Sequence, residues 1–345
     1  MKKDRAIMSA VMVIIIIVCA LMLAEKINFS KDDSPVTVTI SEGASTNDIY
    51  KILKDEKLVK TKIGFFACLK TSKYNGKLRY GTFNLKRNMS INDIFKTLTT
   101  GGASVETFTL TVPEGFSAEK IAQRLSEMNI CTSKEFLDAL NDDYDYSFIK
   151  DIPKKNYKYK LQGFLYPSTY EFYTTATAHE IIDTLLAEFE KNYSSIKNNS
   201  GMSMFDTITL ASLVEREAKL AEERPKIAGV IKNRLKINML LQIDATVVYA
   251  VSDGLYDTDR VLYKDLETDS PYNTYKYTGL PVGPISSVPA TTMEACLQYK
   301  KHDYFYFFAI KDAQDKSKTV VVYTKTYEEH TQQVKKAKDA GLWLD

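Results

Sequence analysis

The sequence predicts an α+β protein: an N-terminal transmembrane helix, then a module of short strands and helices, then a larger mixed α+β domain. Three observations predict this order. Residues 6–24 are almost uninterruptedly apolar, residues 36–127 alternate short strand patterns with helix starts, and residues 161–345 combine helical periodicity with a hairpin pattern. A length of 345 residues suits about two domains.

Composition excludes several classes of protein. Apolar residues make up 44% and charged residues 26%, which excludes a disordered, collagenous or multi-spanning membrane chain. The net charge of +2 lacks the basic excess of nucleic-acid binders, so we expect no nucleic-acid partner. With three His and four Cys we expect no metal and no redox centre. Cys68, Cys131 and Cys296 cannot all pair within one chain, and we expect them to be buried as small apolar side chains.

The apolar stretch at residues 6–24 is interrupted only by Ser9 and is long enough to cross a hydrocarbon core of about 30 Å. Lys2, Lys3 and Arg5 precede it, which favours a cytoplasmic tail at residues 1–5. The alternative is a cleaved signal peptide, but the stretch is long for one and no small-x-small site follows. We therefore expect a single-pass protein of the cell membrane, a polar linker at residues 25–35 and an extracytoplasmic remainder.

The module at residues 36–127 begins with an alternating strand pattern at residues 36–40. Ser45, Ser90 and Ser117 each follow a short strand and a turn, and each is a good helix N-cap. Isoleucine follows each serine after four residues and leucine after eight, which makes one buried stripe per helix. Residues 128–160 are polar and read as a helix and a connecting segment before the domain at residues 161–345.

A helix predicted at residues 206–219, with Asp206 as its cap, carries a glutamate on its apolar side. At about 100° per residue, Glu217 falls within the arc of Leu210, Leu213 and Val214, whereas Glu215 points away from its centre. A buried carboxyl without a partner has a raised pKa, and an acid that stays protonated near neutral pH suits protonation of a glycosidic oxygen. The alternative is a salt bridge to a nearby arginine, and Glu215 is the rival candidate.

The remaining elements follow in order. A second helix is predicted from Pro225 to residue 238, and residues 239–251 read as strand and turn. Pro and Gly make a rigid loop of residues 279–284. Residues 304–310 and 319–323 are predicted to form a hairpin, and a closing helix begins near Thr326.

Several stretches resemble, in family order, the YceG/MltG-type endolytic murein transglycosylases. They are LQGFLYPSTY (161–170), ASLVERE (211–217), AEERP (221–225), NRL (233–235), LQIDATVVY (241–249), YNTY (272–275) and GLP (279–281). The stretch LTVPEGFS (110–117) also resembles the LysM module, a small peptidoglycan-binding fold. For residues 36–127 both a LysM-like sugar-binding module and a purely structural arm remain open.

The resemblance implies an enzyme that cleaves the β-1,4 bond between N-acetylmuramic acid and N-acetylglucosamine within glycan strands. It would leave 1,6-anhydro ends, terminate nascent strands, need no cofactor and work beside cell-wall synthases and elongation or division proteins. The family's catalytic glutamate corresponds to Glu217. As hypotheses, the substrate-binding residues are Glu215, Gln242, Asp244, Tyr272, Asn273 and Tyr166. Their alternative role is to support the fold.

The sequence departs from the family at five positions: Gln162, Ser168, Ala245, Val282 and Val321. The family often has an acid at the first two, proline at the next two and histidine at the last. Loss of the two acids weakens a two-carboxylate mechanism, which ordinary glycosidases use. Two other functions remain open: a hydrolytic muramidase with the same site, and an inactive scaffold that binds peptidoglycan.

Overall fold

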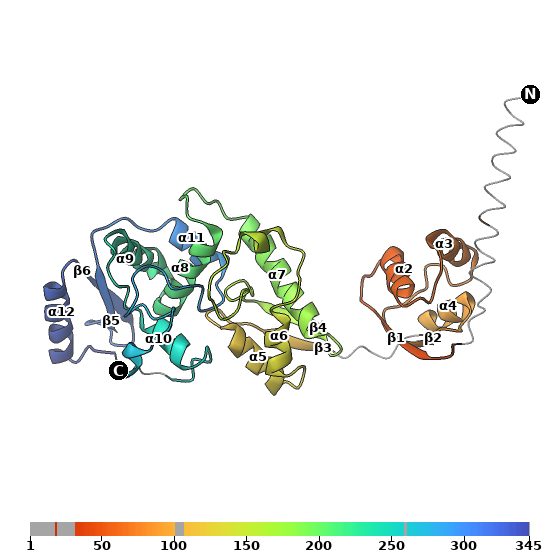
Figure 1. The fold of residues 1–345 in the computed structure, drawn as a ribbon, viewed down its shortest axis with the longest axis horizontal. Coiled ribbons are helices and arrows are strands. Elements are labelled where there is room, and N and C mark those ends of the chain that lie inside the picture. The colour runs from red at the N-terminus through yellow and green to blue at the C-terminus, as the bar shows by residue number, and fades with distance from the viewer. Residues whose placement is uncertain (1–17, 19–31, 101–106, 259–260, 345) are drawn as a thin grey trace, which may run out of the picture. The chain divides into compact units, whose positions relative to one another are not determined.

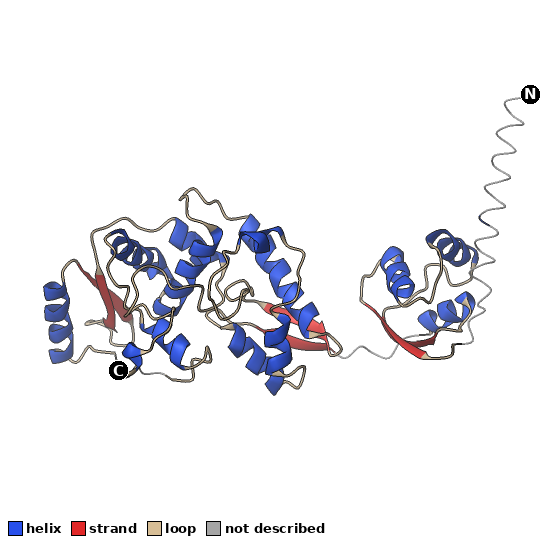
Figure 2. Ribbon diagram, in the orientation of Figure 1, coloured by secondary structure: helices blue, strands red, loops and turns tan. Residues whose placement is uncertain are grey.

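A computed structural model describes residue 18 and residues 32–100, 107–258 and 261–344. Helices dominate this part of the chain, and its strands form separate two-stranded sheets (Figures 1 and 2). The chain divides between Thr107 and Phe108 into two compact units, each with its own hydrophobic core. No helix of the described residues is both long and apolar enough to span a membrane. The expected anchor at residues 6–24 lies outside the described residues apart from Val18.

Unit 1 packs helices around an antiparallel sheet whose register places Val38 opposite Phe83. Its elements are β1 (Pro35–Ile40), α2 (Thr46–Asp55), α3 (Lys62–Thr71), β2 (Gly81–Lys86) and α4 (Ile91–Thr99). The expected caps are confirmed, because the side chain of Ser45 accepts from the N–H of Asp48 and Ser90 does the same at α4. The residues four and eight positions after each cap are buried: Ile49, Leu53, Ile94 and Leu98.

Unit 2 opens with the same order of elements as unit 1. They are β3 (Thr107–Thr111), α5 (Ala118–Glu127), α6 (Ser133–Ala139), β4 (Thr169–Tyr173) and α7 (Ala178–Ser194), with the 3-10 helix η1 (Ser147–Asp151) before β4. β3 pairs with β4 as β1 pairs with β2. In both units a serine caps the first helix and a threonine the second, Ser45 and Thr61 in unit 1 and Ser117 and Thr132 in unit 2. The chain therefore contains one strand–helix–helix–strand–helix arrangement twice.

The boundary between the two units differs from the one that we expected from the sequence. We expected residues 36–127 to form one module, yet the division at Thr107 assigns α5 to unit 2. The reason is packing: Ile121 and Leu125, the stripe of α5, belong to the core that also contains α7 and α8. A repeated local pattern does not show which core each copy joins.

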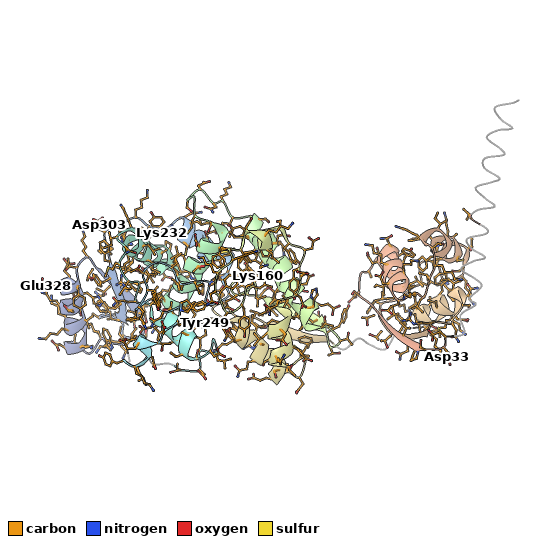
Figure 3. The ribbon with its side chains drawn as sticks, in the orientation of Figure 1. Asp33, Lys160, Lys232, Tyr249, Asp303 and Glu328 are labelled. Atoms are coloured by element: carbon orange, nitrogen blue, oxygen red, sulfur yellow. The ribbon has the colours of Figure 1, made fainter. Side chains whose placement is uncertain are left out.

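The rest of unit 2 surrounds one buried helix, α8 (Met204–Glu217), which packs against α9, α10 and α11. The elements that follow α8 are η2 (Ala221–Glu223), α9 (Arg224–Lys236), α10 (Asp244–Val251), η3 (Asp265–Glu267), α11 (Ala290–Leu297), β5 (Tyr306–Lys311), β6 (Thr319–Thr324) and α12 (Tyr327–Asp339). Tyr249 of α10, labelled in Figure 3, is among the largest fully buried side chains. The expected hairpin is confirmed as β5–β6, and Thr326 caps α12 as expected.

Two local predictions were wrong. Ser203 rather than Asp206 caps α8, because its side chain accepts from the N–H of Asp206. Residues 244–251 form helix α10, not a strand. The valines and threonine of this segment favour strands, but the segment lies against α8, where burial overrides a weak local propensity.

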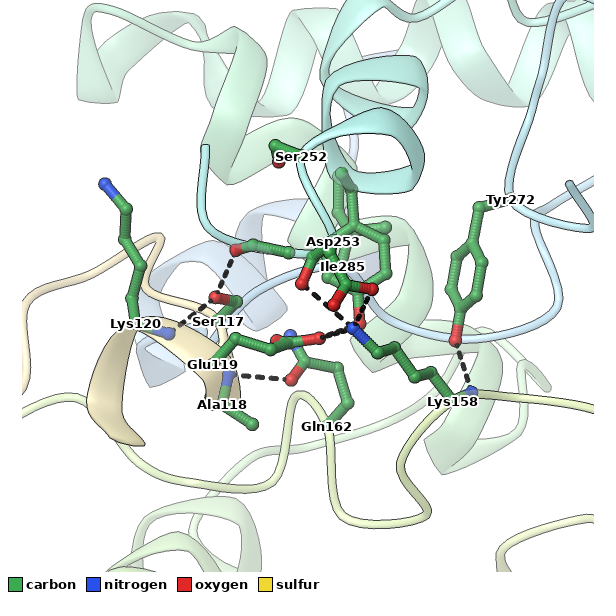
Figure 4. Close-up of polar contacts among 12 residues, drawn as sticks. Ser117, Ala118, Glu119, Lys120, Lys158, Gln162, Ser252, Asp253, Tyr272 and Ile285 are labelled. Carbon is green, nitrogen blue, oxygen red and sulfur yellow. Dashed lines mark hydrogen bonds and ion pairs between the residues drawn. The ribbon is translucent and has the colours of Figure 1, made fainter. Parts of the chain in front are cut away.

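A buried polar cluster fastens α5 to the loop after α10 (Figure 4). Glu119 is 4% exposed, and its carboxylate lies 3.0 Å from Lys158 Nζ. Tyr249 donates to Glu119 Oε1 (3.2 Å), and Ser117 Oγ donates to the carbonyl of Gly254 (2.6 Å). Burial raises the pKa of Glu119, and the charge of Lys158 opposes that rise. Buried polar contacts thus join α5 of the second copy to α10 and the loop that follows it.

Candidate active site

The catalytic candidate Glu217 is the last residue of α8. Residues 207–214 of this helix are buried on all sides, so it has no single apolar face. The helical-wheel prediction that Glu215 points away from the core is therefore wrong, since its side chain is only 7% exposed. The two glutamates differ in their hydrogen-bond and ion-pair partners, and only Glu217 lines the cavity that α8 forms with α9, α10, β5 and α12.

Glu217 lies at a cavity of about 380 Å³. Among the described residues its carboxylate has no hydrogen bond and no ion pair, so the salt bridge considered from the sequence does not form. The cavity is lined by the ends and edges of α8, α9, α10, β5 and α12 together with two loops: Glu217, Val230, Ile231, Arg234, Leu241, Gln242, Ile243, Asp244, Tyr275, Tyr306, Phe307, Phe308, Tyr327 and His330. The Glu217 carboxyl therefore shares this space with charged, amide and aromatic side chains.

Burial raises the pKa of Glu217 to about 7. The second cause in the same direction is the negative charge of Asp244, and the positive charges of Arg216 and Arg234 oppose it. A pKa near 7 leaves a large protonated fraction at neutral pH. It also leaves the conjugate base accessible, which suits a group that both gives and takes a proton.

Gln242 and Asp244 enter the cavity from a loop that leads into α10. The loop is held by residue 274, because the N–H of Gln242 donates to the carbonyl of Thr274 (3.1 Å) and that of Ile243 to its hydroxyl (3.0 Å). Gln242 has φ of 50°, a left-handed conformation that is uncommon outside glycine and that concentrates at functional sites. Tyr275 donates its hydroxyl to Asp244 and so orients that carboxylate.

Arg234 is a largely buried residue of the same cavity lining. It is 9% exposed and donates to the carbonyls of Phe305 (2.6 Å) and Leu241 (2.5 Å), which ties α9 to the hairpin and to the loop of Gln242. Its guanidinium lies 5.1 Å from the centre of the Tyr306 ring. Arg234 thus supplies a fixed positive charge near Glu217 without forming a salt bridge with it.

Glu215 lies in a separate ion-pair network. Its carboxylate lies 3.0 Å from Arg224 and accepts from Thr292 Oγ1 (2.5 Å). Arg224 also reaches Glu114, 3.1 Å away, in the turn before α5. Burial raises the pKa of Glu215, and Thr292 and Arg224 oppose the rise. These contacts join α8, α9, α11 and the second copy of the repeated arrangement, and they do not line the cavity of Glu217.

Three more predicted substrate-binding residues lie away from the cavity. Tyr272 is buried against Tyr249, with 4.8 Å between the ring centres, and its hydroxyl accepts from the N–H of Lys158. Asn273 donates to two backbone carbonyls of residues 266–268. The hydroxyl of Tyr166 accepts from the N–H of Ala290 at the start of α11. The structure thus brings Gln242 and Asp244 to the cavity of Glu217. Tyr272, Asn273 and Tyr166 instead make contacts that support the fold.

None of the five residues that depart from the family pattern lines the cavity, although Ala245 directly follows the lining residue Asp244. Gln162 is buried and its Oε1 accepts from the N–H of Ala118 in the first turn of α5 (2.8 Å), so an acid is not needed to hold this turn. Val321 lies in β6 opposite Ala309. Ser168 accepts through its carbonyl from the N–H of Val112 between β3 and β4.

Sequence reasoning did not single out Tyr275, Arg234, the aromatic residues of β5 or His330 as cavity residues. Tyr275 and Arg234 lie within the family-like stretches YNTY (272–275) and NRL (233–235), so these motifs could have indicated both residues. The apolar pattern of β5 indicated only a strand, and nothing in the sequence indicated which face α12 presents. In the described part of the chain, no group of His, Cys, Asp and Glu side chains is arranged to hold a metal ion.

Comparison with known proteins identifies the family. The sequence profile of the YceG-like family matches residues 38–336. The chain belongs to the YceG-like family. The endolytic murein transglycosylase of Bacillus subtilis is 37% identical over 313 residues, which is 86% of this chain and 84% of that protein. The enzyme of the same name from Streptococcus pneumoniae is 33% identical, over 87% of this chain and 58% of its own length.

A solved structure agrees with this assignment. The crystal structure of a yceG-like protein from Listeria monocytogenes has 33% sequence identity and a TM-score of 0.57, and the match covers 87% of this chain and 99% of that one. The resemblance expected from motifs at residues 161–281 is confirmed, and so is the enzyme class. This YceG-like chain is a lytic transglycosylase.

Proposed function

We propose that the protein is an endolytic peptidoglycan transglycosylase with Glu217 as its single catalytic acid and base. It cleaves the β-1,4 bond between N-acetylmuramic acid and N-acetylglucosamine within glycan strands. The observation that carries the proposal is the unpaired carboxyl of Glu217, with a pKa of about 7, at a cavity lined by polar and aromatic side chains. The names of the relatives from two bacterial genera support murein as the substrate.

The reaction needs one proton to be given and one to be taken. Protonated Glu217 donates to the oxygen that bridges the two sugars, and the bond between that oxygen and the anomeric carbon breaks. The acetamido group of the muramic sugar stabilises the developing positive charge. The Glu217 carboxylate then accepts the proton of the 6-hydroxyl, whose oxygen bonds to the anomeric carbon. The products are a 1,6-anhydro end and a free 4-hydroxyl, and Glu217 is protonated again.

The charges around Glu217 suit both halves of this cycle. Asp244 disfavours the Glu217 carboxylate and so keeps the acid form populated before cleavage. Arg234 and Arg216 act in the other direction and limit the rise of the pKa. Gln242, Asp244 and Tyr275 present amide, carboxylate and hydroxyl groups that bind sugar hydroxyls.

Residues 6–24 anchor the enzyme in the cell membrane by a single span, and units 1 and 2 lie on the extracytoplasmic side. This placement puts Glu217 beside glycan strands as they are made, so cleavage terminates their elongation. The apolar run and the basic residues before it support the anchor. The stretch that resembles the LysM module, residues 110–117, lies in unit 2, from the end of β3 to the start of α5. The same element order in unit 1 supports a sugar-binding role for that unit too, which binding of unit 1 to insoluble murein tests.

A hydrolytic muramidase is the second candidate, because Asp244 places a second carboxylate at the same cavity. Digestion of isolated murein, followed by mass spectrometry of the products, separates the candidates. We expect 1,6-anhydro ends from the wild-type protein and intact strands from Glu217→Gln. Reducing ends would identify the muramidase. Intact strands with both proteins would leave only a binding scaffold and refute the enzymatic role of this site.

A further inference from the structure

A second cavity adjoins the cavity of Glu217. It has a volume of about 410 Å³, and its lining residues in the described chain all belong to α12. Tyr327 and His330 line both cavities, so the two are neighbours. Figure 1 shows α12 at the edge of unit 2, beside the hairpin of β5 and β6. The cavity of Glu217 is therefore followed by a second space along this helix.

The residues that line the second cavity follow one stripe of α12. At about 100° per residue, four of them fall within an arc of about 60°. They are Tyr327, Thr331, Val334 and Lys338. The first and the last are separated by about 16 Å along the helix axis, at a rise of about 1.5 Å per residue. That length accommodates more than one sugar ring, and it begins at the cavity of Glu217.

The side chains of this stripe are accessible and suit a glycan that carries acidic groups. Tyr327 is 66% exposed, so its ring is available for a sugar ring to stack on. Lys335 and Lys338 are exposed, and within the described chain neither forms an ion pair. Ammonium groups pair with carboxylates, which muramic sugars carry on their lactyl groups or stem peptides. Asp339 at the end of the helix also lines the cavity, and the two lysines leave an excess of positive charge.

Cleavage within a strand requires that sugars continue on both sides of the broken bond. The cavity of Glu217 holds the sugars next to that bond, and the rest of the strand must leave along the protein surface. We propose that the cavity on α12 binds this continuing part of the strand, with Tyr327 stacked on a sugar ring and Lys335 and Lys338 paired with carboxylates of the muramic sugar or its stem peptide. This inference rests on the proposed function and assigns where the enzyme recognises the length and the acidic groups of its substrate.

Strand length separates a binding role of α12 from a structural one. Strands of four and of eight alternating N-acetylglucosamine and N-acetylmuramic acid residues, with stem peptides, serve as substrates. Loss of two exposed ion pairs in the double variant Lys335→Gln/Lys338→Gln is expected to raise KM for the eight-sugar strand roughly three- to ten-fold, with kcat and the four-sugar KM each within about two-fold. Tyr327→Ala should raise KM for both strands, because Tyr327 lines both cavities.

The matched control is Lys336→Gln. Lys336 is exposed and lies between the two lysines in sequence, but it falls on the opposite side of α12 from Tyr327 and lines neither cavity. This variant removes the same charge from the same helix, and its KM for both strands should equal that of the wild type. A rise in the eight-sugar KM as large as that of the double variant would overturn the inference, because net charge alone would then explain the effect.

A second measurement needs no cleavage. Lys338 Nζ lies 4.8 Å from the centre of the ring of Trp343, the single tryptophan of the chain, so a carboxylate that binds Lys338 should change the tryptophan emission. In the Glu217→Gln protein we expect a saturable change with the eight-sugar strand and a much smaller one with the four-sugar strand. Unchanged emission at saturating eight-sugar strand, or an unchanged eight-sugar KM in the folded double variant, would overturn the inference. If the wild-type protein leaves murein intact while the emission change persists, the proposed function fails and the binding site on α12 stands.

Discussion

Replacement of Glu217 by glutamine should stabilise the protein at alkaline pH and change its stability little at acid pH. The pKa of Glu217 rises from an ordinary 4.5 to about 7 on folding, so the folded state holds a proton that the unfolded state has released between these values. The free energy of unfolding of the wild-type protein therefore falls as the pH rises from 4.5 to 7. Above pH 7 the folded state holds an ionised Glu217 without a partner, so the full loss in the free energy of unfolding is present.

The size of the effect follows from the same pKa values. At about 1.4 kcal/mol per pKa unit, the rise to about 7 corresponds to roughly 3 kcal/mol. Solvent that reaches the half-buried side chain reduces this value, so we expect Glu217→Gln to gain roughly 1–3 kcal/mol relative to the wild type between pH 5 and pH 8.5. Glutamine is uncharged at both pH values and does not carry the penalty.

Urea unfolding followed by tryptophan fluorescence measures this difference. The chain has a single tryptophan, Trp343, which stacks on Phe308 in unit 2, so the signal reports the unit that holds Glu217. The control is Glu188→Gln in α7, where Lys191 lowers the pKa of the carboxyl and the pH dependence has the opposite sign. An equal difference between wild type and Glu217→Gln at pH 5 and pH 8.5 would refute the reasoning.

Two further predictions concern the charge beside the acid and the packing beneath it. Asp244→Asn removes a charge that raises the pKa of Glu217, so the alkaline limb of a kcat/KM–pH profile should move to lower pH; an unmoved limb would contradict the coupling. Gly163 has φ of +88°, and an added Cβ would lie 2.5 Å from Pro284. Gly163→Ala should therefore cost roughly 3–5 kcal/mol in chemical denaturation, from strain and clash together. Gly201→Ala, with φ of +71° and open space, isolates the strain at about 1–2 kcal/mol, and equal losses would contradict the clash.

Local signals in the sequence were sufficient for several elements. Ser45 and Ser90 could be recognised as caps because a capping serine and the apolar residues four and eight positions later lie within one short stretch. The β5–β6 hairpin was predictable because two apolar runs flank a polar turn. The catalytic candidate Glu217 was chosen from its place on a helical wheel and from motif resemblance.

The errors arose where distant packing decides the outcome. α8 is buried on all sides, so a helical wheel could not distinguish Glu217 from Glu215; the ion pair of Glu215 with Arg224 depends on the fold. α10 has strand-forming residues but is held as a helix against α8. His330 belongs to the cavity only because the hairpin brings α12 there, and no local pattern carries that information.

The titration of Glu217 itself tests the central claim most directly. The side-chain carboxyl carbons of 13C-labelled glutamate can be followed by NMR from pH 3 to pH 10, and the Glu217→Gln protein identifies the resonance by its absence. We predict that this carboxyl titrates near pH 7 while exposed glutamates titrate near 4. A midpoint between 4 and 5 for Glu217 would contradict an acid kept protonated by burial.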